Sequence, residues 1–253
     1  MLEPLHPALR AMSTAPAPII NTLTQELLGR DRRALFGAEG KPSQPAMTSD
    51  SLELGQADRT RLQQTRVYIL PGTPWPGVAD NGAAWTKPWS DTLRQMGVGR
   101  VVPVNYGGGS DVGTFARIFA DPVTGAAEKR VMAQISADLK AKPLAQGERI
   151  MILGHSFGSL MGGKVAEKLQ AKGLPVAGMI MLETHLPDVG QFAKKAPALP
   201  RVVEVENEAR TKLQVSGKSK FDRVYVPQLS HMDIVMRPPA SLMRQIVREL
   251  AAP

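Results

Sequence analysis

The sequence predicts an α/β fold: a doubly wound, mostly parallel sheet of about six strands with helices on both faces. Short apolar runs alternate with stretches of helical spacing through residues 65–253. The runs are continuously apolar instead of alternating with polar residues, as expected of strands covered on both sides. Because crossovers between parallel strands are right-handed, such a chain winds its helices onto both faces of one sheet.

Residues 1–64 are expected to form an N-terminal arm that precedes this domain. Helical spacing over Ile19 to Leu28 predicts one short helix in the arm, and residues 37–50 have the Gly, Pro and Ser content of a flexible connector. A second short helix is left open before Gln64. The arm is therefore expected to be partly helical or flexible.

The expected strands are bounded by turn residues or by helices. The first ends at the Pro-Gly-Thr-Pro sequence of residues 71–74, and the second runs into three glycines. The six strands are expected at 66–70, 100–104, 149–153, 176–182, 201–205 and, at its start, 223–226.

Helical periodicity accounts for the segments between the strands. Trp85, Trp89 and Leu93 share one face of a helix that Gly97 ends. Pro238 and Pro239 open a last helix with a single apolar face. The other helices are expected at 127–141 and 159–172.

One stretch, IMILGHSFG at 150–158, has a chemical signature. An apolar strand enters Gly154-His155-Ser156-Phe157-Gly158, and a helical pattern follows directly. A strand, a tight turn with serine at its tip, and a helix form the nucleophile elbow G-x-S-x-G. The glycines are expected where strand and helix backbones approach too closely for a side chain. The alternative interpretation is a serine that caps a structural helix.

A nucleophilic serine needs a general base, here a histidine. His231 follows the last expected strand and precedes the last helix, where the chain order serine, acid, histidine places the base. His185 is the second candidate, two residues beyond a strand end. The side chain of His155, beside the serine, is expected to point away from it.

The histidine in turn needs a carboxylate partner. Glu183 ends the strand that follows the elbow helix and is the favoured acid. Glu206 and Glu208, at the end of the next strand, are the alternatives. A solvated carboxylate or a partner of a basic side chain is the non-catalytic interpretation of each.

An oxyanion hole would complete the site. One donor is expected to be the backbone N–H of Phe157, the residue after the nucleophile. The other is expected from Thr73 after the first strand, since Pro74 has no N–H. Ser156, Glu183, His231 and this loop all follow strands at their carboxyl ends, where ligands bind to such sheets.

These residues resemble the α/β-hydrolase superfamily, over about residues 65–253. Within it, residues 154–187 resemble thioesterase domains of polyketide and nonribosomal peptide synthesis. In those domains the acid ends the strand after the elbow helix, usually as Asp, which implies Glu183 here. The resemblance also covers their oxyanion loop, at 71–73, and their base with its last helix, at 229–250. It implies that residues 65–253 are an α/β-hydrolase catalytic domain.

The chain departs from those thioesterase domains in three ways. The acid would be Glu, and Pro74 replaces a residue that could donate an N–H. Only 17 residues, 184–200, separate the strands between which those domains carry a helical lid. No large lid is therefore expected, and an open site suits esterase or lipase chemistry as well as thioester hydrolysis.

Composition limits the chemistry and the partners. The chain has no cysteine, which excludes disulfides, thiolate catalysis and Cys-ligated zinc. A net charge of +8 favours an anionic membrane surface or an acidic carrier protein, but the charge is scattered, and no nucleic-acid site is expected. No apolar run is long enough to span a bilayer, and the N-terminus lacks the usual shape of a signal peptide. These observations do not assign the protein to a cellular compartment.

The sequence therefore predicts a serine hydrolase that cleaves acyl esters or thioesters through an acyl-enzyme and requires no metal or organic cofactor. Two alternatives remain. The positive charge and the arm favour a membrane-directed phospholipase, and Pro74 with the open choice of acid favours a non-catalytic binding protein of the same fold.

Overall fold

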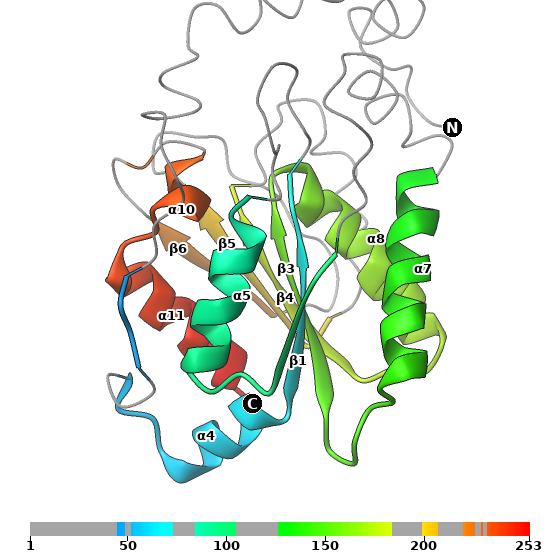
Figure 1. Ribbon diagram of the computed structural model, residues 1–253, viewed down its shortest axis with the longest axis horizontal. Helices are drawn as coiled ribbons and strands as arrows, with labels where there is room; N and C mark the ends of the chain where they lie inside the picture. The colour runs from blue at the N-terminus through cyan, green and yellow to red at the C-terminus, as the bar shows by residue number, and fades with distance from the viewer. Residues whose placement is uncertain are drawn as a thin grey trace, which may run out of the picture.

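A computed structural model gives the fold (Figure 1). The described residues are 45–48, 52–72, 84–104, 126–183, 199–206, 220–225, 229 and 232–253. The helix expected at 19–28 lies outside them, as does most of the connector expected at 37–50.

Six parallel strands form one sheet in the order β2-β1-β3-β4-β5-β6. This confirms the predicted doubly wound α/β class, and every strand pair within the described residues is parallel. The last strand begins earlier than expected because it lies at the sheet edge and has three charged residues among its first four, so its first half is not an apolar run. The strands are β1 (Thr65–Leu70), β2 (Arg100–Pro103), β3 (Arg149–His155), β4 (Val176–Leu182), β5 (Arg201–Glu206) and β6 (Lys220–Tyr225).

Helices cover both faces of the sheet, to its left and right in Figure 1. The first face carries α4, α5, α10 and α11, and the second carries α7 and α8. Their bounds are α4 (Gln56–Gln63), α5 (Thr86–Gln95), α7 (Ala126–Ala141), α8 (Phe157–Ala171), α10 (Asp233–Met236) and α11 (Ala240–Ala251).

The chain runs outward from β1 to β2 in one direction and from β3 to β6 in the other. Right-handed crossovers in opposite directions put α5 on one face and α7 and α8 on the other. The order therefore reverses between β1 and β3, and the carboxyl ends of these two strands form a topological switch point, where ligands bind in sheets of this kind.

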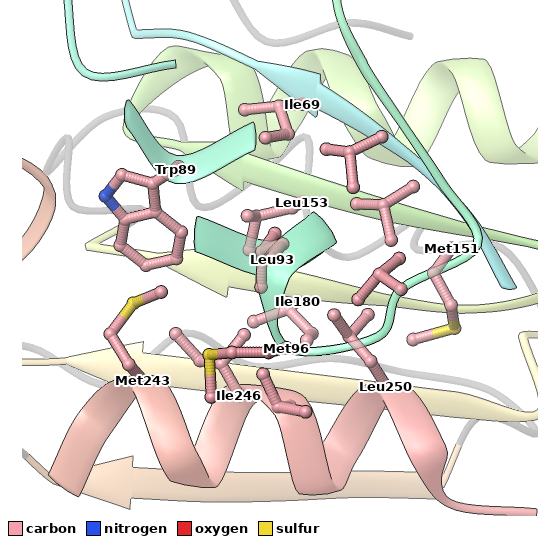
Figure 2. Packing of buried hydrophobic residues seen from close by; sticks show 14 of the residues in the cluster. Ile69, Trp89, Leu93, Met96, Met151, Leu153, Ile180, Met243, Ile246 and Leu250 are labelled. Carbon is pink, nitrogen blue, oxygen red and sulfur yellow. The ribbon is translucent and has the colours of Figure 1, made fainter. Parts of the chain in front are cut away.

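The core of the first face lies between the sheet and the two helices α5 and α11. Figure 2 shows Trp89 and Leu93 of α5, and Met96 just after it, among sheet residues and side chains of α11. The amphipathic spacing that predicted α5 and the last helix is the spacing by which they enter this core. Leu52 and Leu62 are also buried here, so the described end of the predicted arm packs against the domain.

Two arginines bind the carboxyl end of α11. Arg149 donates to the carbonyl oxygens of Leu250 (2.7 Å) and Ala252 (2.6 Å), and Arg61 donates to that of Ala251 (2.8 Å). They satisfy carbonyls that a helix end leaves without partners and complement its dipole. Burial lowers the pKa of Arg149, and the nearby charge of Arg61 lowers it further.

A buried ion cluster occupies the amino ends of β1 and β2. Arg66, only 2% exposed, donates to Glu148 (2.7 Å) and to Asp138 (3.1 Å). Tyr68 donates its hydroxyl to the same Asp138 carboxylate (2.9 Å), and Arg100 pairs with it as well. The cluster joins α7 and the segment before β3 to the start of β1.

The cluster shifts the pKa of its members. Burial by itself would raise the pKa of Asp138, but the hydrogen bonds from Arg100 and Tyr68 outweigh burial and hold this pKa below its usual value. In Glu148 burial would likewise raise the pKa, but the hydrogen bonds from Arg66 and from the Ala145 N–H, together with the charges of Arg66 and Arg100, outweigh it and lower the pKa. Carboxyl groups with a depressed folded-state pKa contribute stability above their unfolded pKa, and this stability is lost as the pH falls through the folded value.

We expect the free energy of unfolding to decrease as the pH falls below about 4, the ordinary carboxyl range. Asp138→Asn should flatten that decrease and should cost about 3 kcal/mol at neutral pH, because it leaves buried arginines without their carboxylate. Urea denaturation across the pH range measures both effects. The matched control is Asp91→Asn, whose carboxylate is 43% exposed and pairs with Lys87 on the surface. Equal losses in the two variants would contradict a stabilising role for the cluster.

Candidate active site

Ser156 lies at the tip of the turn between β3 and α8, beside the switch point. Its backbone has φ 53° and ψ −123°, a region that costs a non-glycine residue about 1–3 kcal/mol. Its N–H donates to Leu182 (2.9 Å), and its C=O accepts from Ser159 (3.0 Å), so both neighbouring elements hold the strained conformation. The hydroxyl makes no capping hydrogen bond to α8, which disfavours the interpretation of Ser156 as a structural cap.

Both glycines of the elbow lie against backbone. A Cβ on Gly154 would lie 2.6 Å from the carbonyl oxygen of Gly158, and one on Gly158 would lie 2.3 Å from the carbonyl oxygens of Leu70 and Pro71. Neither strand nor helix backbone can move away without moving the sheet. The close approach that the sequence predicted is therefore present on each side of Ser156.

Gly158→Ala is expected to destabilise the protein by about 3 kcal/mol, because the new methyl group meets rigid backbone. A thermal melt measures the loss. Gly55→Ala is the control, since a Cβ there would meet only the Asp58 carboxylate at 3.6 Å. A Gly158→Ala melt that matches this control would show that the elbow tolerates a side chain.

The end of β1 also lies against the nucleophile. A Cβ on Gly72 would be 3.2 Å from the Cβ of Ser156 and 3.0 Å from Nδ1 of His155. Gly72 directly precedes Thr73, the expected second oxyanion donor, which lies outside the described residues. Phe157, the other expected donor, is the first residue of α8.

Glu183 lies directly beyond β4, on the strand next to the elbow. The register pairs His155 with Leu182, so the residues that follow, Ser156 and Glu183, leave adjoining strands at the same level. Glu183 is 1% exposed, has φ 44°, and its N–H donates to Val205 (2.8 Å). Two neighbouring strands thus end in a buried polar residue with strained backbone, a combination typical of functional sites.

The other candidates are placed only in part. Glu206 ends β5, and its backbone pairs with Tyr225, but its side chain is not among the described ones. Glu208, His185 and His231 lie outside the described residues. Glu204 of β5 is 2% exposed and is not among the predicted candidates. The signal in the sequence is a carboxylate between the valines of this strand.

His155 turns toward the face covered by α5. It is 1% exposed and meets Trp85 edge-on, with ring centroids 5.9 Å apart. Trp85 meets Trp89 in the same way at 5.5 Å. Trp85 therefore packs against the residue just before Ser156. Local sequence patterns could not reveal this contact, because it joins two segments far apart in the chain.

Among the described side chains, no cluster of three or more His, Asp or Glu is arranged to hold a metal ion. Within the same part of the chain, no helix has the length and apolar composition needed to cross a bilayer.

Comparisons with known proteins give matches among solved structures only, since no family model and no curated protein matches the chain. A lidless α/β serine hydrolase from Xanthomonas campestris is 13% identical, with a TM-score of 0.48 over 83% of this chain and 85% of that one. The RedJ thioesterase of prodiginine biosynthesis from Streptomyces coelicolor is 13% identical, with a TM-score of 0.47 over 88% and 95%.

A protein described as a YdeN-like hydrolase from Pectobacterium atrosepticum is 15% identical, with a TM-score of 0.46 over 79% of this chain and all of that one. At these identities the likeness is one of fold.

Proposed function

We propose that this protein is a serine hydrolase that cleaves acyl esters or thioesters. The observation that supports the proposal most is the strained Ser156 at the switch point, held by backbone on both sides and making no structural hydrogen bond to the helix it precedes. Natural folds retain backbone strain of this kind where a side chain must be presented.

Each residue has a role in the proposed reaction. The Ser156 hydroxyl oxygen attacks the acyl carbon while His231 takes its proton, and Glu183 orients the imidazole and stabilises its cation. The N–H groups of Phe157 and Thr73 donate to the oxyanion. The histidine then returns the proton to the departing alcohol or thiol. Water, activated by the same base, releases the acid and restores Ser156.

The proposed substrates are acyl esters and acyl thioesters, the latter carried by coenzyme A or an acidic carrier protein. The assignment of residues 65–253 as the catalytic domain is part of the proposal. The excess of basic residues would speed the association of the protein with an acidic carrier or an anionic membrane surface.

The test is covalent labelling. The full chain is incubated with a fluorophosphonate probe, digested, and the adduct located by mass spectrometry, and we expect it on Ser156. Hydrolysis of short and long p-nitrophenyl esters, of acyl-coenzyme A, and of anionic phospholipid vesicles then separates esterase, thioesterase and phospholipase activity. A chain that stays unlabelled and inert toward all of them would refute the proposal and favour a binding protein.

A further inference from the structure

We infer that Trp89 is a positioning residue for the catalytic base: its indole N–H fixes α10, the short helix that begins just after His231. The inference rests on the proposed function, because it takes His231 as the base. It concerns a residue that does not touch the reacting atoms and acts through the backbone of another element.

The contact is a buried hydrogen bond between distant parts of the chain. Nε1 of Trp89 donates to the carbonyl oxygen of Val235 at 2.7 Å, and the Trp89 side chain is fully buried. On burial the indole N–H gives up its hydrogen bond to water, and the Val235 carbonyl replaces that partner. The bond therefore fixes both the ring and the carbonyl.

α10 depends on such outside contacts. It has four residues, and its internal bonds run from Val235 and Met236 back to Met232 and from Arg237 to Asp233. A single turn is not stable by itself, because nucleation fixes several backbone angles for few hydrogen bonds. Its position therefore comes from the burial of Ile234 and Val235 and from the Trp89 bond.

The same helix that holds α10 also supports the elbow. α5 carries Trp89 and, one turn earlier, Trp85, which packs on His155 next to Ser156. The Trp89 side chain is fully buried, and Figure 2 shows its ring near Met243 of α11, a member of the same core cluster. α5 is thus the common reference for the segment carrying the nucleophile and the segment that follows the base.

A general base must lie about 3 Å from the hydroxyl it deprotonates. A displacement of about 1 Å costs on the order of 100-fold in rate. His231 joins α10 through Met232 alone. The Val235 carbonyl lies four residues after His231. Its release is therefore expected to displace the base, and to affect proton transfer more than substrate binding.

The experiment compares Trp89→Phe with Leu93→Ala in the full chain. Both shorten a fully buried side chain of α5, but Leu93 has no polar side-chain atom and so holds no backbone group by a hydrogen bond. Trp89→Phe should lower kcat on a p-nitrophenyl ester by roughly 10- to 100-fold with KM unchanged. The rate of fluorophosphonate labelling should fall by the same factor, and the pH–rate profile should change. Leu93→Ala should also lose thermal stability yet keep the wild-type kcat and pH–rate profile.

A second variant removes the donor without changing the shape. 3-Benzothienylalanine at position 89 has a sulfur in place of the N–H and nearly the size of tryptophan, so it tests the bond even if Trp89→Phe does not fold. Wild-type kcat in this variant, or equal kcat and pH profiles in Trp89→Phe and Leu93→Ala, would overturn the inference. Failure of the proposed function is a different outcome, since the wild-type chain would then itself be inert.

Discussion

Ser156→Ala is expected to lower kcat/KM for a p-nitrophenyl ester by at least about 10³-fold, because no other group can form the acyl-enzyme. Residual hydrolysis above the background would come from the oxyanion donors and from binding. The melting temperature should change little, since alanine at this position keeps the same backbone conformation. Steady-state kinetics and a thermal melt measure the two effects.

The control for this prediction is the next serine along the chain, directly after the motif. Ser159 is 1% exposed and donates its hydroxyl to the Gly154 carbonyl (2.8 Å), so its role is structural. Ser159→Ala should cost about 1 kcal/mol of stability and should keep the label on Ser156. A label that is lost in Ser159→Ala and persists in Ser156→Ala would identify Ser159 as the nucleophile and contradict the proposal.

Glu183→Gln is expected to lower kcat/KM by roughly 10³- to 10⁴-fold, with the fold intact. Glutamine keeps the shape of the side chain but cannot stabilise the imidazolium cation that forms as Ser156 attacks. Because Glu183 is 1% exposed, water cannot replace the lost charge. Kinetics across the pH range, with circular dichroism to monitor the fold, test this expectation.

The alternative acids provide the comparison. Glu206→Gln and Glu208→Gln should stay within about threefold of the wild-type rate if Glu183 is the acid, because neither change would reach the imidazole. A large loss in Glu206→Gln or Glu208→Gln, with Glu183→Gln nearly normal, would move the acid to the end of β5. The pair of results thus decides between the two strand ends.

Most of the fold could be predicted because its strands are buried runs with their own signature. The polar helix α4 gave a weak signal, since Leu62 is its one buried residue, and α10 is too short for any periodicity to register. The beginning of β6 was missed since an edge strand need not be apolar on both faces.

Part of the candidate site could be predicted from the sequence, and part could not. The elbow could be predicted because the residues that shape it are consecutive, and Gly154 and Gly158 have a reason visible in the sequence. The choice among Glu183, Glu206 and Glu208 could not, because it depends on how neighbouring strands are staggered. The Trp89–Val235 bond joins residues 146 positions apart and follows no local pattern.

The ion cluster around Arg66 lies at the amino ends of the strands, as do the two arginines that bind the carboxyl end of α11. Ser156 and Glu183 lie at the carboxyl ends of the strands. Substitutions at widely separated sites contribute almost independently to stability. A lineage carrying this fold can therefore explore new substrates at one rim of the sheet while the opposite rim preserves its thermal tolerance. Directed evolution of this chain should begin at the carboxyl rim and leave the amino rim untouched.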